Sequence, residues 1–199
     1  MKDLFVLVAD ADMKAVMEVL LKEKYQYQLG IKKLDFEIYR HPKKDSGVRK
    51  DSVEIFLNQY SEFYKGLVML DYDGSGFKDS PQELEKRIKE DIIKYTSWSK
   101  KNVEVIVIYP EIEIWVWGVA DKFPEIFHNK DIPRYSGRKP LHPKEEFEKI
   151  LRKVGRSLSP GLFEEIARKV SRHHIDNCRD RAFRKLVDTL RGWFGVSSS

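Results

Sequence analysis

Four short apolar runs, most of them followed by a stretch of helical spacing, limit the fold of this chain more than any other feature. The runs span residues 4–9, 34–39, 66–70 and 103–109, and each has the length of a β-strand. After the first three, apolar residues recur every three or four positions, as in amphipathic helices. Strands this uniformly apolar have no face suited to water. The sequence therefore predicts an α/β fold: a three-layer sandwich with a central, mostly parallel four-stranded sheet.

Acidic residues follow the third apolar run directly, at Asp71 and Asp73. Alternate residues of an extended chain share a face, so we expect these two carboxylates to point at one spot. Like charges held together are unfavourable unless a cation, a proton or a basic side chain lies between them, which makes a divalent metal the first interpretation. A tight turn that caps the next helix is the alternative. An EF-hand calcium loop is disfavoured, because its twelfth position would be Gln82 rather than Glu.

Polar residues also follow the other predicted strands. Right-handed crossovers bring the carboxyl ends of parallel strands to one edge of the sheet, where ligands of such folds bind. His41 could act as a general base, because its unperturbed pKa lies near neutrality, or be an ordinary loop residue. Asp10 could equally be a helix cap. The complete set expected at this edge is Asp10, Asp12, His41, Asp45, Asp71, Asp73, Glu111 and Glu113.

Basic residues are concentrated in the C-terminal part of the chain. Residues 134–199 carry 16 Lys and Arg against 8 Asp and Glu, and apolar stripes predict helices from Pro143, from Pro160 and from Asp180. We expect an α/β domain at 1–128, a linker or loop at 129–142 and a basic helical extension at 143–199 packed on the α/β domain. Nucleic-acid phosphates or a merely solvated surface would both suit the charges. The candidate nucleic-acid contacts are Lys43, Lys44, Arg49, Arg172, Arg181 and Arg184.

Composition bears on the cellular compartment of the protein. The chain has 199 residues, of which 41% are hydrophobic, and a net charge of +5. Its single cysteine, Cys178, cannot form an intramolecular disulfide, which suggests a reducing compartment. The apolar stretches are shorter than the roughly 20 residues of a membrane span. We therefore expect a cytoplasmic protein without a membrane partner.

Three segments of the sequence resemble a known family. They are residues 4–10, His41-Pro42 with Asp45 and Gly47, and residues 110–117 with their Glu-x-Trp motif. Together they resemble a small Toprim-like component of methylation-associated defence systems of bacteria and archaea, related to RloB-type proteins. This resemblance implies a Toprim-like domain that holds Mg²⁺ or Mn²⁺ for phosphodiester chemistry.

Carried over to this chain, the resemblance assigns the metal to Asp71, Asp73 and Glu113, and proton transfer to Asp10 or His41 beside Glu113. Two functions follow as expectations. One is a metal-dependent nuclease or phosphotransfer enzyme of antiviral defence. The other is a non-catalytic subunit that binds nucleic acid or the other proteins of a defence complex. The second arises because Toprim enzymes usually carry a Glu just after the first strand, where this chain has Ala9.

Overall fold

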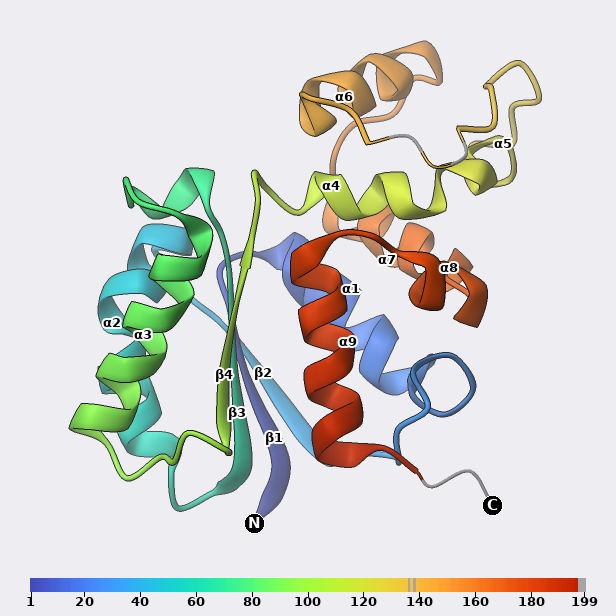
Figure 1. Cartoon of the computed structure of the whole chain (residues 1–199). Helices are drawn as coiled ribbons and strands as arrows, with labels where there is room; N and C mark the ends of the chain where they lie inside the picture. Colours follow the sequence, from blue (N-terminus) through green and yellow to red (C-terminus); the bar gives the residue numbers. More distant parts are fainter. Residues whose placement is uncertain (136, 138, 197–199) are drawn as a thin grey trace. The chain divides into compact units, whose positions relative to one another are not determined.

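The computed structural model describes residues 1–135, 137 and 139–196, and a four-stranded parallel sheet lies at its centre (Figure 1). The strand order is β2-β1-β3-β4, with every neighbouring pair parallel. This confirms the predicted α/β class and the four-stranded parallel sheet. The strands are β1 (Lys2–Val8), β2 (Phe36–Arg40), β3 (Phe63–Asp71) and β4 (Val103–Ile108).

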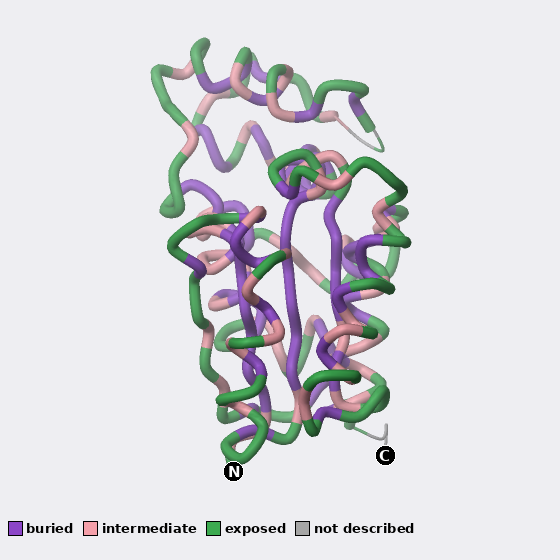
Figure 2. Tube along the Cα trace, turned by 90° about the vertical axis from the view of Figure 1, so that its left-hand side faces the viewer, coloured by how far each residue is buried: buried purple, intermediate pink, exposed green. Residues whose placement is uncertain are grey.

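The central strands are buried on both faces. Every residue of β3 from Gly66 to Asp71 is buried, as is every residue of β1 from Leu4 to Val8. Figure 2 shows this buried core running along the strands. Successive side chains of a strand point to opposite faces, so burial of consecutive residues requires cover on both sides of the sheet. This is the arrangement expected of a three-layer sandwich.

Two helices cover one face of the sheet, α2 (Lys44–Gln59) and α3 (Pro81–Tyr95), and they lie side by side (Figure 1). The sequence Ser80-Pro81 followed by Glu83 predicts a helix start, and α3 begins there: Pro81 occupies the first turn, and the Ser80 hydroxyl accepts a hydrogen bond from the Glu83 N–H at 3.1 Å.

The predicted start of α2 is wrong. The sequence pattern of Asp51 and Glu54, three residues apart before apolar residues, predicts a capping box at the N-terminus of this helix, but the helix begins at Lys44. The structure satisfies the start of the helix in another way, because Nδ1 of His41 accepts a hydrogen bond from the Lys43 N–H at 3.0 Å. Sequence patterns that look for Ser, Thr, Asp or Asn caps do not detect a histidine in this role.

An acidic side chain closes the free edge of β4. Glu85 of α3 is buried, and its Oε1 accepts a hydrogen bond from the Val107 N–H at 2.9 Å. One turn further along α3, Lys89 pairs with Glu104 of the strand at 2.6 Å. Edge strands present backbone groups that could recruit another chain. Here the neighbouring helix binds part of that edge.

The described residues form two compact units. One consists of residues 1–14 and 33–110 and contains the whole sheet. The other consists of residues 15–32 and the chain from Glu111 onward. Besides most of α1 (Ala11–Lys22), the second unit contains η1 (Tyr25–Leu29), α4 (Glu113–Val116), η3 (Trp117–Lys122), α5 (Phe123–Ile126), α6 (Pro143–Lys153), α7 (Pro160–Lys169), α8 (Arg172–Asn177) and α9 (Arg181–Phe194).

The helices predicted from Pro143, from Pro160 and from Asp180 are confirmed as α6, α7 and α9, whereas α8 was not anticipated. Both alternation and helical spacing fit the short sequence of residues 115–121, and the structure shows this segment as helical. The domain boundaries given above stay a prediction. Of the proposed linker at 129–142, residues Ser136 and Arg138 lie outside the described residues.

Two tryptophans build the core of the second unit. Trp115 packs edge-on against Phe183, with ring centroids 5.2 Å apart, and its indole N–H donates to Asp180 at 3.0 Å. Trp117 donates to the Pro143 carbonyl at 3.1 Å. Buried indole groups need such partners. Both side chains therefore serve packing rather than exposed base stacking.

We predict that Gly66→Ala lowers the free energy of unfolding by about 1–3 kcal/mol, the usual cost of overpacking a core. A Cβ atom at this position would come within 2.4 Å of the Phe56 ring, which itself packs against Trp98 at 5.5 Å. Gly161→Ala in α7 is the control, because a Cβ there meets nothing within 4 Å. Chemical denaturation measures both variants. Equal stability of the two would contradict this account of β3.

Candidate functional site

The end of β3 places Asp71 and Asp73 differently from the sequence expectation. The strand ends at Asp71, which is buried, and the chain leaves the extended conformation at Tyr72, with φ −67° and ψ −48°. Asp73 begins the short helix η2 (Asp73–Ser75) and is exposed. Its N–H donates to the Pro110 carbonyl at 3.2 Å, which fixes this turn beside the end of β4. The alternation that was to pair the two carboxylates therefore does not hold.

Asp45 connects two of the strand ends. It lies in the first turn of α2, and its Oδ1 accepts a hydrogen bond from the Asp71 N–H at 2.7 Å. Its other oxygen lies against Gly74, where an added Cβ would come within 2.3 Å of Oδ2. Asp45 thus fixes the backbone at the end of β3, and the loop needs a glycine to approach it.

Burial raises the pKa of the Asp45 carboxyl above its usual range. The hydrogen bond from Asp71 opposes this rise in pKa, and the negative charge of Asp10 adds to it. An acid whose pKa is higher in the folded than in the unfolded protein destabilises the fold when ionised. That cost disappears as the pH falls below the folded-state pKa.

Asp10 caps a helix. Its Oδ1 accepts a hydrogen bond from the Met13 N–H at 2.9 Å, and its carbonyl accepts one from Lys14 at 3.2 Å at the start of α1. Asp12 lies in the first turn of the same helix, where negative charge is favourable. The cap interpretation of Asp10 is confirmed, and its role in proton transfer stays a prediction.

His41 fills the interior of the β2–α2 junction. Its side chain is 4% exposed, with Nε2 3.2 Å from the Asp51 carboxylate, while Nδ1 accepts the Lys43 N–H. A Cβ at Gly47 would come within 2.2 Å of the ring. Both ring nitrogens are engaged inside the fold. This geometry favours a structural role, and general-base catalysis by His41 stays a prediction.

Two further acids follow β4, and they share one cation. The Lys144 ammonium, near the start of α6, lies 2.9 Å from Glu111 Oε2 and 3.6 Å from Glu113 Oε1. The Glu113 side chain is only 5% exposed. Burial lowers the pKa of Lys144, but its hydrogen bond to Glu111 and the charges of both glutamates outweigh this and leave the pKa above its usual range. Lys144 therefore stays protonated.

These observations define a candidate metal site. Glu111 and Glu113 both direct a carboxylate oxygen at the Lys144 ammonium, so these two acids could share a metal ion. Asp71, to which the resemblance also assigns the metal, belongs to the other compact unit. Carboxylate oxygens are the ligands that Mg²⁺ and Mn²⁺ prefer. The Lys144 ammonium shows that the carboxylates of Glu111 and Glu113 converge on one positive charge.

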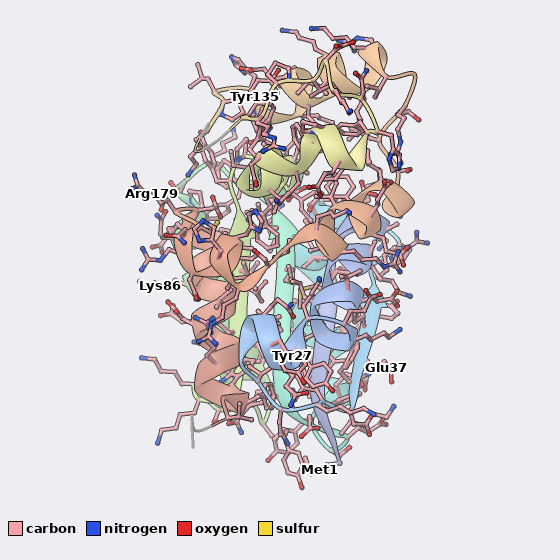
Figure 3. All side chains as sticks on the ribbon, turned by 90° about the vertical axis from the view of Figure 1, so that its right-hand side faces the viewer. Met1, Tyr27, Glu37, Lys86, Tyr135 and Arg179 are labelled. Carbon is pink, nitrogen blue, oxygen red and sulfur yellow. The ribbon has the colours of Figure 1, made fainter. Side chains whose placement is uncertain are left out.

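The candidate basic residues fall into two groups. Lys43, Lys44 and Arg49 lie around the start of α2, where Lys43 is 3.5 Å from Asp51. The others lie on α8 and α9: Arg172 is 3.4 Å from Asp176, whereas Arg184 is exposed. Figure 3 shows Arg179, between these helices, directed outward. The surface is positive but partly neutralised.

Sequence reasoning placed Glu111 only among the acids of this edge and missed Lys144. The sequence marks α6 by its proline and apolar stripe, but nothing in that pattern distinguishes Lys144 from the other lysines of the helix. Its partners lie more than 30 residues away in the chain. Only the fold reveals the pairing.

Comparisons with protein-family models, with curated proteins and with solved structures find no match to this chain. Among the described residues, none of the helices combines the length and the apolar composition that crossing a lipid bilayer requires.

We predict that Asp45→Asn raises the free energy of unfolding at pH 7, because the amide oxygen still accepts the Asp71 N–H while the buried charge is gone. The advantage should shrink as the pH falls through the raised pKa of folded wild-type Asp45, and it should be gone below the usual carboxyl pKa of 3.8, where both the folded and the unfolded wild-type carboxyl are protonated. Asp45→Ala should lose about 1–3 kcal/mol, because it leaves a buried N–H without its acceptor. Denaturation across pH measures all three proteins. Equal destabilisation by Asp45→Asn and Asp45→Ala at pH 7 would contradict the role of Asp45 as acceptor of the Asp71 N–H.

Proposed function

We propose that this protein binds a divalent cation, Mg²⁺ or Mn²⁺, through Glu111 and Glu113, with Asp71 as the further ligand that the resemblance implies, and acts on the phosphodiesters of nucleic acids. The observation that supports this most is the shared cation: Glu111 and Glu113 approach a single ammonium group at 2.9 and 3.6 Å. Two acids that converge on one monovalent cation offer oxygen ligands of the kind that a divalent ion prefers.

Each part of the site has a defined task in this proposal. A bound ion would polarise a phosphate oxygen and lower the pKa of a water molecule. Glu113 would serve as an almost fully buried ligand, and its low exposure would strengthen its attraction for a cation. Asp45 would act indirectly: its carboxylate accepts a hydrogen bond from the backbone N–H of Asp71 at 2.7 Å and so positions that ligand.

The resemblance to Toprim-like components of defence systems supports nucleic acid as the substrate and other defence proteins as partners. The Glu-x-Trp motif at Glu113 and Trp115 contributes to that resemblance. The fold gives each residue a distinct place: Glu113 opens α4, and Trp115 anchors this helix to Asp180. A tryptophan two residues after the ligand would therefore hold the ligand helix in position.

The positive surface of α8 and α9 supports a second candidate, a non-catalytic subunit that binds nucleic acid. Arg172 is 72% exposed, and Arg184 is exposed on the outer face of α9. Exposed positive charge attracts a phosphate backbone without regard to sequence. This function needs no metal, so the two candidates are separable by experiment.

For the metal site, we predict that Asp71→Asn and Glu113→Gln each weaken Mn²⁺ binding at least about tenfold, a loss of roughly 1.4 kcal/mol. Asp73→Asn is the matched control, because Asp73 lies two residues from Asp71 and is exposed. It should leave the affinity unchanged. Isothermal titration measures the affinities, and Mn²⁺-dependent cleavage of labelled DNA and RNA measures turnover. Wild-type protein that binds no Mn²⁺ would contradict the proposal.

For the positive surface, we predict that Arg184→Glu weakens binding to a DNA or RNA oligonucleotide and flattens its salt dependence. Asp188→Lys, one helical turn further along α9 and also exposed, should strengthen binding. Fluorescence anisotropy at several salt concentrations measures both. No change in either variant would exclude this surface as the binding face.

A further inference from the structure

We propose that Lys144 competes with the cation for Glu111 and Glu113, so that its ammonium group must leave both glutamates before a divalent ion can bind. This inference rests on the proposed metal site and concerns its regulation. The starting observation is that the Lys144 ammonium both hydrogen-bonds Glu111 at 2.9 Å and lies 3.6 Å from Glu113. It already occupies the position between two carboxylates that a metal would take.

Occupation by the lysine and by a metal is mutually exclusive. A bound Mg²⁺ lies about 2.0–2.1 Å from its oxygen ligands. An ammonium group 2.9 Å from Glu111 would then lie within a few ångströms of the ion, whichever oxygen of that carboxylate the ion takes, and two positive charges at that spacing repel strongly. Binding of the metal must therefore move Lys144 away from the glutamates.

Lys144 also neutralises the two glutamates, and its side chain can move away from them. Glu113 is nearly buried, and a buried carboxylate without a partner is costly. Lys144 is 39% exposed, so its long side chain can swing from the glutamates into water without crossing a packed core. The buried Glu113 side chain is fixed, whereas the Lys144 side chain can move into solvent.

The position of the α6 N-terminus would be linked to this exchange of Lys144 for a metal ion. Lys144 directly follows Pro143, whose carbonyl accepts the Trp117 indole N–H at 3.1 Å. Trp117 lies in the aromatic core of the second unit, with its ring centroid 5.7 Å from that of Phe123. A partner or substrate that shifts the N-terminus of α6 would therefore change how closely Lys144 approaches the glutamates.

The test combines affinity with chemical labelling. Lys144→Met keeps the length of the side chain but removes its charge, and it should tighten Mn²⁺ binding about tenfold or more by isothermal titration. Lys149→Met is the matched control, because Lys149 lies on the same helix and is exposed. It should leave the affinity unchanged. In wild-type protein, Mn²⁺ should increase acetylation of Lys144 by an N-hydroxysuccinimide ester, read by mass spectrometry, while acetylation of Lys149 stays constant.

The outcomes separate this inference from the function on which it rests. If Mn²⁺ binds the wild type and Lys144→Met equally, and Lys144 acetylation does not respond to Mn²⁺, competition is overturned while the metal site stands. If neither protein binds Mn²⁺, the metal site itself is overturned and the inference with it. The labelling arm uses wild-type protein, so it decides the question even if a variant fails to fold.

Discussion

Burying a carboxylate costs electrostatic free energy, and the structure offsets this cost for Asp45, Glu111 and Glu113 with a specific partner. The Asp45 carboxylate accepts a hydrogen bond from the main-chain N–H of Asp71 at 2.7 Å. Glu111 and Glu113 share the ammonium group of Lys144. A buried charge without such a partner would be unstable, so these contacts are a condition for placing acids after β2 and after β4.

A backbone N–H and a lysine ammonium group differ in how easily they can move away from the carboxylate that they contact. A backbone N–H is fixed by the strand to which it belongs, so Asp45 serves the architecture of the β3 turn. A lysine side chain is flexible and half-exposed, so the acids that it neutralises can exchange it for another cation. In the function we propose, Glu111 and Glu113 rather than Asp45 therefore serve as the ligands of a metal ion.

Strand periodicity and helix-capping chemistry made much of the fold predictable, because both depend on local sequence. The four strands and the Ser80 cap follow from patterns within a few residues. The pairing of Asp71 with Asp73 did not follow, because tertiary hydrogen bonds to the end of β4 turn the chain at Tyr72. Lys144 could not be found at all, because its role depends on contacts more than 30 residues apart.

The most direct measurement is a crystal structure of the protein grown with Mn²⁺, with the ion located by its anomalous scattering. Our account predicts a peak at bonding distance from the carboxylate oxygens of Glu111 and Glu113, with the ammonium group of Lys144 withdrawn from both. A crystal saturated with Mn²⁺ that shows no ion at these glutamates, and Lys144 still seated on Glu111, would contradict it.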